Sequence, residues 1–265
     1  MTKPDIRFND GAAYERMMGV WSRLAGDVFL DWLAPEKGLR WIDVGCGNGA
    51  FTERVVERCA PASIEGIDPS EAQLAYARER HKAGIATYRN GDAMALPFAN
   101  DSFDIAASAL VLFFVPDPGK AVAEMARVTK PGGIVATYLW DIPGAGLPMA
   151  PVGIELRALG APAATPPSAG VSKMENLRTT WEKAGLAEID TREIAVERTF
   201  ESFDEFWDIT VNGTALREAV NTLNADDASG IKQRVRSRLA INGVGRVLAK
   251  AKANAIRGRV SAGKP

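Results

Sequence analysis

Short apolar runs alternate with longer amphipathic stretches over the first half of the chain. The apolar runs predict buried strands at residues 41–44, 63–67, 85–89, 101–108 and 134–139. The stretches between them carry apolar residues at helical spacing and predict helices at 51–58, 71–82 and 121–128. This alternation of strands and helices is typical of an α/β protein, in which helices cover both faces of a mostly parallel sheet.

The segments on either side of this region have other patterns. Residues 14–33 carry an apolar stripe and predict one or two helices, which end before Pro35. Prolines are dense between residues 140 and 170, which predicts an irregular excursion over the rim of the sheet. The remaining pattern predicts helices at 154–159, 172–184 and 201–212, and strands at 187–198 and 246–256. In the helix at 172–184, Ser172 is the expected N-cap and Glu175 completes a capping box.

Composition narrows the class of protein. The chain has 265 residues, of which 46% are hydrophobic, so it can bury the core of a single domain. Its net charge of −1 gives no indication of nucleic-acid binding. The two cysteines are too few for a disulfide framework and favour a reducing cytoplasm. No apolar run is long enough for a membrane span or a secretory signal, and we predict no metal site.

Charge is uneven along the chain. From residue 231 onward the charged residues are ten Lys or Arg, with no Asp or Glu. Solvated charges at a sheet edge explain this run. Attraction of an acidic substrate is the alternative interpretation.

The stretch WIDVGCGNGAFT, residues 41–52, is the centre of the candidate chemistry. A buried strand, a glycine turn and a helix start follow one another there. Glycines allow close backbone approach to a ligand, and the free amide groups of a helix start favour an anion. Two templates fit. Gly45, Gly47 and Ala50 satisfy the looser dinucleotide fingerprint, whereas Asp43, Gly45, Gly47 and Gly49 satisfy D-x-G-x-G-x-G in full.

The second template resembles class I S-adenosylmethionine-dependent methyltransferases, in particular those of ubiquinone and menaquinone biosynthesis. The acidic residue discriminates between the templates, because Asp43 would repel a pyrophosphate but attract the ammonium of a methionine moiety. The resemblance implies that the loop residues Gly45, Cys46, Gly47 and Gly49 contact the cofactor. It also implies that residues 1–35 form a helical lid, with Tyr14 and Trp21 near the sulfonium. Packing of these two aromatic residues against the sheet is the alternative.

Two later acidic residues fit the same cofactor. Asp68 ends the second predicted strand, where a carboxylate can accept both ribose hydroxyls, although an N-cap role also fits. Pro69 opens the following helix, and the resemblance places Gln73 near the adenine. Residues 90–98 resemble the family's third cofactor motif, in which Asp92 accepts the adenine amine. In that motif Ala93 donates to a ring nitrogen and Met94 lines the ring.

The end of the fourth predicted strand is lined by small residues. Ala106, Ala107 and Ser108 leave room for a ligand there. The residues that follow resemble the position where the family places the floor of the transferred methyl group: Ala109, Leu110, Phe113 and Phe114. The string RVTKPGG, residues 127–133, is a further family feature, for which we expect a structural role only. Asp141, Tyr138 and Tyr14 are weak candidates for a general base, and Trp140 with Asp141 for contact with the acceptor.

The resemblance implies a Rossmann-like sheet of seven strands with an antiparallel strand at the edge. It divides a single domain of residues 1–265 into the lid, a cofactor-binding core at 36–140, and substrate-side insertions with the last two strands at 141–265. The helical stretch 201–240 is then an insertion. The expected function is methyl transfer from S-adenosylmethionine, which becomes S-adenosylhomocysteine, to a small-molecule acceptor. An NAD-dependent oxidoreductase and a non-catalytic nucleoside-binding protein are the alternatives.

Overall fold

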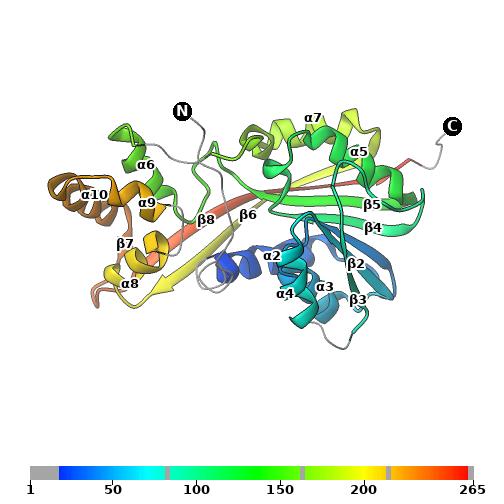
Figure 1. Ribbon diagram of the computed structural model, residues 1–265, viewed down its shortest axis with the longest axis horizontal. Coiled ribbons are helices and arrows are strands. Elements are labelled where there is room, and N and C mark those ends of the chain that lie inside the picture. The colour runs from blue at the N-terminus through cyan, green and yellow to red at the C-terminus, as the bar shows by residue number, and fades with distance from the viewer. Residues whose placement is uncertain (1–17, 81–83, 162–164, 213–215, 262–265) are drawn as a thin grey trace. The chain divides into compact units, whose positions relative to one another are not determined.

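A computed structural model describes residues 18–80, 84–161, 165–212 and 216–261 (Figure 1). The expectation for Tyr14 lies outside these residues. The described chain divides into two compact units. The sheet unit comprises residues 22–143, 167–194 and 253–265, and the helical unit comprises residues 1–21, 144–166 and 195–252. Strands β6 and β8 contribute residues to both, and the single-domain organisation stays a prediction.

The sheet has the strand order β3-β2-β1-β4-β5-β8-β6. Its strands are β1 (Arg40–Val44), β2 (Ser63–Asp68), β3 (Ala86–Asn90), β4 (Phe103–Ala109), β5 (Thr129–Trp140), β6 (Leu186–Phe200), β7 (Ala240–Ile241) and β8 (Val247–Val260). The pairs β1–β2, β2–β3, β1–β4 and β4–β5 are parallel, whereas β8 is antiparallel to β5. The predicted α/β Rossmann-like class is therefore confirmed.

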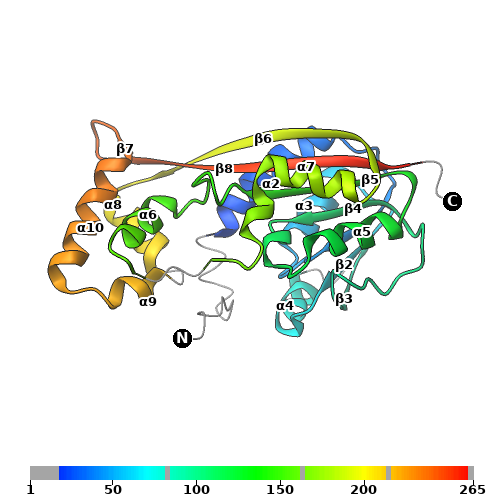
Figure 2. The ribbon, with the colours of Figure 1, turned by 90° about the horizontal axis from the view of Figure 1, so that it is seen from above.

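The antiparallel strand lies one position in from the edge. β8 runs beside β6, which is outermost (Figure 2). The two-residue β7 pairs with β8 and brings the sheet to eight strands in the described part of the chain. β5 begins at Thr129, earlier than predicted, because Thr129 pairs with Phe103 ahead of a register shift.

Helices cover both faces of the sheet. Figure 1 shows α5 (Pro118–Val128) and α7 (Met174–Lys183) on one face, and α2 (Val20–Leu33), α3 (Ala50–Cys59) and α4 (Glu71–Arg80) on the other. Helix α5 begins three residues earlier than predicted, because Pro118 occupies its first turn and the Asp117 carboxylate accepts the Lys120 amide at 3.0 Å. Its apolar face is buried against β4 and β5.

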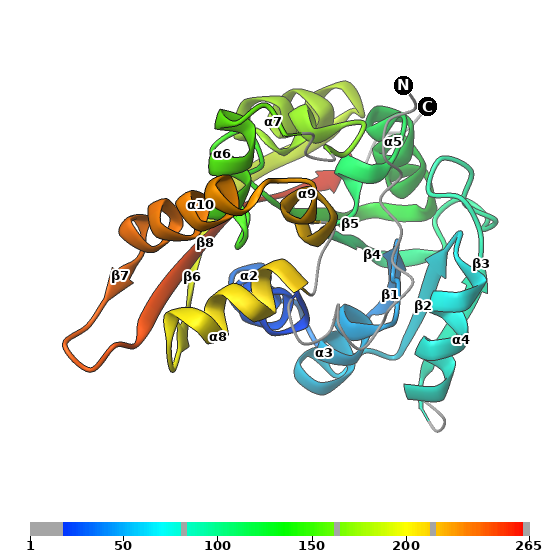
Figure 3. The same ribbon diagram turned by 60° about the vertical axis from the view of Figure 1, so that its left-hand side comes forward.

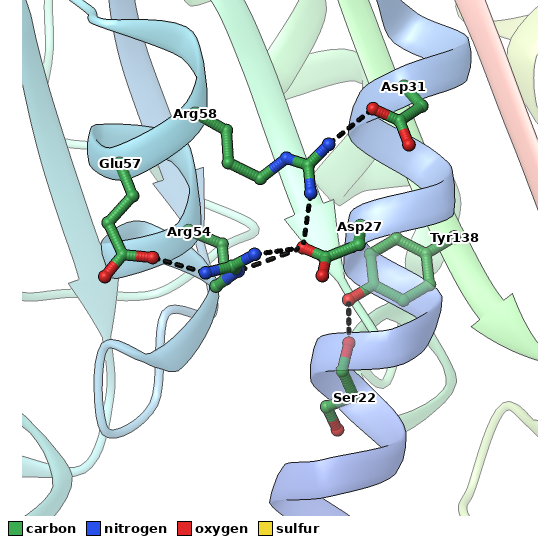
Figure 4. Close-up of polar contacts among 7 residues, drawn as sticks. All are labelled: Ser22, Asp27, Asp31, Arg54, Glu57, Arg58 and Tyr138. Atoms are coloured by element: carbon green, nitrogen blue, oxygen red, sulfur yellow. Dashed lines mark hydrogen bonds and ion pairs between the residues drawn. The ribbon is translucent and has the colours of Figure 1, made fainter. Parts of the chain in front are cut away.

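Helix α2 is joined to α3 by a cluster of ion pairs (Figure 4). The Asp27 carboxylate accepts two hydrogen bonds from Arg54, at 2.9 and 2.7 Å, and lies 3.3 Å from Arg58. Arg58 also pairs with Asp31 at 2.5 Å. At the C-terminal end of the helix, next to Asp31, Arg257 donates to the carbonyl groups of Trp32 and Leu33. These contacts fix residues 22–33 of α2 in the sheet unit, and the role of the helix as a lid stays a prediction.

The predicted capping box of α7 is wrong. The N-cap of α7 is Lys173, which makes no side-chain cap. The Ser172 hydroxyl is instead fully buried, donates to the Ala169 carbonyl at 2.7 Å and accepts the Ile142 amide at 3.3 Å. Tertiary contacts therefore use the hydroxyl that local sequence assigned to the helix. Gly185, with φ 73°, ends the helix as expected.

The helical unit contains α6 (Ala150–Ala158), α8 (Phe203–Trp207), α9 (Leu216–Asn221) and α10 (Ala225–Arg238), and α6 contacts both α9 and α10 (Figure 3). The short 3-10 helices η2 (Leu112–Phe114) and η3 (Ala169–Ser172) belong to the sheet unit. The helix predicted at 201–212 consists of two parts. The α-helix α8 ends at Trp207, and a π-helix follows it over Asp208–Asn212. The buried rings of Phe200 and Phe206 pack edge to face in the helical unit, with their centroids 5.3 Å apart.

The basic run is neutralised largely within the chain. Seven of its side chains form ion pairs: Lys232 with Asp204, Arg234 and Arg238 with Glu155, Arg246 with Glu201, Lys250 with Glu197, Arg257 with Asp190 and Arg259 with Glu188. The Glu155 side chain is almost fully buried, and its hydrogen bonds with Arg234 and Arg238 lower its pKa. Exposed pairs contribute little stability, at about 0–1 kcal/mol each, but they reduce the local positive field.

Trp181 anchors α7 to the sheet and provides a test of this packing. Its indole is fully buried and donates to the Val135 carbonyl at 3.1 Å. We expect Trp181→Phe to lower the free energy of unfolding by about 2–4 kcal/mol, because it leaves a cavity and removes the hydrogen bond to the Val135 carbonyl. Urea denaturation measures this loss. The control Leu159→Ala, at a side chain that is 40% exposed, should stay within about 0.5 kcal/mol of the wild type. Equal losses in both variants would contradict the packing described here.

Candidate functional site

The glycine turn joins the end of β1 to the start of α3. Gly45, Gly47 and Gly49 all have positive φ, at 79°, 51° and 79°. A Cβ at Gly45 would lie 2.4 Å from a Val111 methyl carbon, whereas a Cβ at Gly47 would meet nothing within 4 Å. The turn is therefore packed at its first glycine and open at its second. The amides of Gly45 and Cys46 both donate to the Ile67 carbonyl, which ties the turn to β2.

Asp43 lies beneath this turn. Its side chain is 1% exposed, and its Oδ2 accepts a hydrogen bond of 2.6 Å from the Thr52 hydroxyl. Its Oδ1 is buried with no hydrogen-bond partner among the described residues. A buried acceptor without a partner costs about 1–3 kcal/mol, more when it is charged. An ionised Asp43 is therefore suited to a cationic donor.

Burial raises the pKa of the Asp43 carboxyl to about 7. The Thr52 hydrogen bond lowers this pKa, and the nearby negative charge of Asp68 raises it. A donor bound to Oδ1 would favour the charged carboxylate and bring the pKa down again. The ionisation of Asp43 thus depends on what occupies the site.

Asp68 closes the second side of the turn. Its Oδ2 accepts the Gly47 amide at 3.0 Å and its Oδ1 accepts the Ser70 amide at 2.9 Å. Both bonds stabilise the carboxylate, although burial is the larger effect and raises the pKa of Asp68 overall. Each oxygen retains a lone pair that can accept a further hydrogen bond. Asp68 accepts an amide just before α4, as a capping residue would, and it can still accept ribose hydroxyls. The structure is therefore compatible with both predicted roles of Asp68.

The loop that follows β3 carries the third acidic residue. Asp92 is exposed, and its Oδ1 accepts the Met94 amide at 2.8 Å. The Gly91 amide donates to the Asp68 carbonyl at 3.2 Å, so this loop lies at the tip of β2. The loop is fixed further along by Arg127, which donates to the carbonyl groups of Leu96 and Phe98. The structural role expected for the RVTKPGG string is therefore to hold this loop.

Parallel pairing brings the three carboxylates to one edge of the sheet. In the register of β1 with β2, Asp43 pairs with Gly66, and in that of β2 with β3, Asp68 pairs with Asn90. Carboxyl ends of neighbouring parallel strands form the usual ligand crevice of such sheets. The contact of these residues with a cofactor stays a prediction.

The other predicted cofactor residues occupy varied environments. Cys46 is a buried free thiol whose pKa is raised by burial. The Ser108 hydroxyl is buried without a hydrogen-bond partner in the described structure, and Ala109 beside it is half-buried. Both residues lie at the C-terminal end of β4. The remaining residues are Trp21, which is buried in the first turn of α2, Pro69, which is exposed, and Gln73, Ala93 and Met94, which are half-buried.

The candidates for a general base differ in their surroundings. The Tyr138 ring is buried 4.9 Å from the Phe29 ring, and its hydroxyl donates to the Ser22 carbonyl at 3.3 Å (Figure 4). This geometry is that of a core residue. Asp141 is half-buried just after β5, and Trp140 is buried with no hydrogen-bond partner for its indole nitrogen among the described residues.

The sequence reasoning missed Thr52 and Tyr88. Thr52 lies in the first turn of α3 and faces back to β1, so its position one helical turn after Gly49 is a signal that could have found it. The half-buried Tyr88 is hydrogen-bonded to Thr52, and that bond depends on the pairing of β3 with β2.

A family model described as a methyltransferase domain matches residues 42–137. A ubiquinone/menaquinone biosynthesis C-methyltransferase of Paracoccus denitrificans is 38% identical over 121 residues, which are 44% of this chain and 48% of that protein. A malonyl-acyl-carrier-protein O-methyltransferase of Pectobacterium atrosepticum is 35% identical over 130 residues, which are 47% of this chain and 50% of that protein. The chain thus spans about half the length of the curated relatives it matches.

The fold has solved counterparts. The phosphoethanolamine N-methyltransferase 2 of Haemonchus contortus, in complex with phosphomonomethylethanolamine and S-adenosylhomocysteine, matches with a TM-score of 0.60. The match covers 94% of this chain and 57% of that chain at 20% identity, so it shows the fold alone. The matched segment is thus similar to a class I S-adenosylmethionine-dependent methyltransferase domain, and the described fold is that of such a domain. The predicted resemblance is confirmed.

The described residues contain neither a membrane-spanning helix nor a cluster of metal ligands. None of the described helices is both long and apolar enough to cross a membrane. Within the same residues, no group of three or more His, Cys, Asp or Glu side chains is placed to hold a metal ion.

The raised pKa of Asp43 predicts a specific dependence of stability on pH. Between the ordinary pKa of 3.8 and about 7, the folded state holds a proton on Asp43 that the unfolded state has lost. Stability from this group is therefore lost as pH rises through that window. We expect the free energy of unfolding of the wild type, relative to Asp43→Asn, to fall by roughly 3 kcal/mol between pH 5 and pH 8 without ligand. Urea denaturation at both pH values measures it, and a difference that does not change with pH would contradict the assignment.

Proposed function

We propose that the protein transfers a methyl group from S-adenosylmethionine to a small-molecule acceptor. The observation that carries this proposal is the buried Oδ1 of Asp43, which has no partner among the described residues and lies beneath a glycine turn. An ammonium group is a donor that matches a carboxylate in charge as well as in hydrogen bonding. The methionine part of the cofactor supplies such a group, so the residues present fit it.

The same turn is poorly suited to a dinucleotide. A pyrophosphate would lie beside the carboxylates of Asp43 and Asp68 and would be repelled. The Gly47 amide already donates to Asp68, and the Ala50 amide at the start of α3 donates to the Asn48 side chain at 3.2 Å. The backbone donors that a phosphate needs are thus engaged. These contacts favour the methyltransferase over the NAD-dependent oxidoreductase.

The remaining carboxylates supply acceptors for the nucleoside. In the proposal, Asp68 accepts the two ribose hydroxyls with its free lone pairs. Asp92 accepts the adenine amine, the Ala93 amide donates to a ring nitrogen, and Met94 contacts the ring. Support comes from the placement of these residues after β2 and β3, at the edge of the sheet where β1 ends.

The proposed reaction depends mainly on how the acceptor is aligned with the methyl group of the cofactor. When bound, S-adenosylmethionine supplies a methyl group that is already activated. The protein therefore has to hold the acceptor in line with the methyl group and exclude water. Ser108 and Ala109 at the tip of β4 leave space beside the reacting atoms, and Asp141 is the described candidate for a base if the acceptor must lose a proton.

The charge of the acceptor is not part of this proposal. The basic run that suggested an acidic acceptor is largely engaged in ion pairs with acidic residues of the chain. The proposed compartment is the cytoplasm, which is supported by two cysteines that are both free thiols. One curated relative is named for ubiquinone/menaquinone biosynthesis and another for malonyl-acyl-carrier protein, so likeness to them does not select an acceptor.

Calorimetric titration tests the proposed function. We expect S-adenosylhomocysteine to bind with a dissociation constant in the micromolar range and NAD to bind at least about tenfold more weakly. A screen of small metabolites with labelled S-adenosylmethionine then identifies the acceptor. Tight binding of NAD without binding of S-adenosylhomocysteine would exclude this function.

A matched pair of glycine variants tests where the ligand lies. Gly47 and Gly38 both have positive φ, and a Cβ at either would meet nothing within 4 Å. Gly47→Ala and Gly38→Ala should therefore lose similar stability, about 1 kcal/mol, from backbone strain. Only Gly47→Ala should weaken S-adenosylhomocysteine, by about tenfold or more, because its methyl group occupies the open side of the turn. Equal affinities of the two variants would place the ligand elsewhere.

A further inference from the structure

Three positions lie in one row across the strands next to the glycine turn. Asp43 on β1 pairs with Gly66 on β2, and Gly66 pairs with Tyr88 on β3. Paired residues of neighbouring strands point to the same face of a sheet. Asp43 and Tyr88 thus point to the face that α3 covers, and the position between them has no side chain.

The missing side chain lets the Tyr88 ring reach across β2. A Cβ at Gly66 would lie 2.6 Å from Cδ1 of Tyr88 and 2.9 Å from Sγ of Cys46. Real Cβ atoms do not approach other atoms so closely, so the ring and the thiol occupy the space over Gly66. The tyrosine hydroxyl is thereby brought to α3 instead of to solvent.

Thr52 joins the two outer members of the row. Its hydroxyl is fully buried and donates to Oδ2 of Asp43 at 2.6 Å. Tyr88 is also hydrogen-bonded to the Thr52 side chain. When Asp43 is ionised, the single proton of the Thr52 hydroxyl goes to Asp43, so the Tyr88 hydroxyl donates and Thr52 accepts. A chain of hydrogen bonds therefore runs from Tyr88 through Thr52 to the carboxylate.

We propose that Thr52, polarised by Tyr88, is a positioning residue that holds Oδ2 of Asp43 and leaves Oδ1 free for the ammonium group of the ligand. This inference rests on the proposed function and adds two residues to its site. Hydrogen bonds in a chain strengthen one another, so Tyr88 makes Thr52 a better donor. Thr52 thus sets both the direction of the carboxylate and the ease with which it ionises.

The groups that face Asp43 make its charge depend on the ligand. Thr52 from α3 favours the charged form, whereas Asp68 from β2 disfavours it. Cys46 in the turn and Tyr88 on β3 also interact with its charge, and burial raises the pKa of both so that both stay neutral. With a pKa of about 7, Asp43 must lose a proton to receive an ammonium group below neutral pH. Binding of the ligand is then linked to release of a proton.

The first experiment needs no ligand. The carbon-13 shift of the Asp43 carboxyl is followed against pH in the wild type, Thr52→Val, Thr52→Ser and Tyr88→Phe, with Asp43→Asn to assign the signal. We expect Thr52→Val to raise the titration midpoint by about one pH unit, Thr52→Ser to restore it, and Tyr88→Phe to raise it by less. The matched control is Thr129→Val, which also removes a fully buried hydroxyl, one that donates to the Met125 carbonyl at 2.7 Å. It should leave the midpoint unchanged.

The second experiment measures binding of S-adenosylhomocysteine to the same variants at pH 6, 7 and 8. In the wild type the affinity should be about tenfold weaker at pH 6 than at pH 8, because about one molecule in ten is ionised at the lower pH. Thr52→Val should bind about fivefold more weakly than the wild type at pH 7, and Thr52→Ser should bind normally. Calorimetric titrations of S-adenosylhomocysteine in buffers of different ionisation enthalpy should show that binding releases a proton. The number of protons released should decrease toward pH 8.

The outcomes separate this inference from the proposed function. An Asp43 midpoint that is the same in Thr52→Val as in Thr129→Val overturns the positioning role, whatever binds. A shifted midpoint with an unchanged pH profile of binding also overturns it, because Asp43 then does not receive the ammonium group. Failure of the wild type to bind S-adenosylhomocysteine at any pH would instead refute the proposed function, and the carboxyl titration would still decide whether Thr52 orients Asp43.

Discussion

The hydrogen bond between Thr52 and Asp43 is the interaction on which the candidate site depends. β1 has to be buried to carry the glycine turn at its end, and burial removes water from the Asp43 carboxylate. Thr52 replaces part of that lost hydration with one fixed donor. The bond also ties β1 to the first turn of α3, so the same contact holds the turn and orients the charge beneath it.

The rest of the sheet unit keeps that contact in place. Helix α3 is fixed from outside by the pairs of Arg54 and Arg58 with Asp27, and α2 is held in turn by Arg257. Arg127 holds the loop after Asp92 by donating to the carbonyl groups of Leu96 and Phe98. Charged side chains thus serve mainly to bind backbone carbonyl groups and neighbouring helices. The strand tips can then present carboxylates that have capacity left for a ligand.

The match to a methyltransferase domain concerns only part of the chain. The family match and the motifs lie within residues 42–137, where the turn and the strand tips are built. The helical unit contains most of the later segments, and the names of the relatives differ, one in ubiquinone/menaquinone biosynthesis and one for malonyl-acyl-carrier protein. A shared fold specifies how a nucleoside is presented but not what receives the methyl group.

The sequence by itself determined the strands, the helices that alternate with them and the acidic residues at their ends, because apolar spacing and glycine turns are local properties. It failed where a distant group changed a side chain's partner. Ser172 bonds Ile142 and Ala169 instead of capping α7, and the basic run after residue 231 pairs with acids of earlier segments. Only the tertiary structure joined Tyr88, Gly66 and Asp43 in one row beneath Thr52. The register between parallel strands decides such a row, and no local pattern in the sequence encodes it.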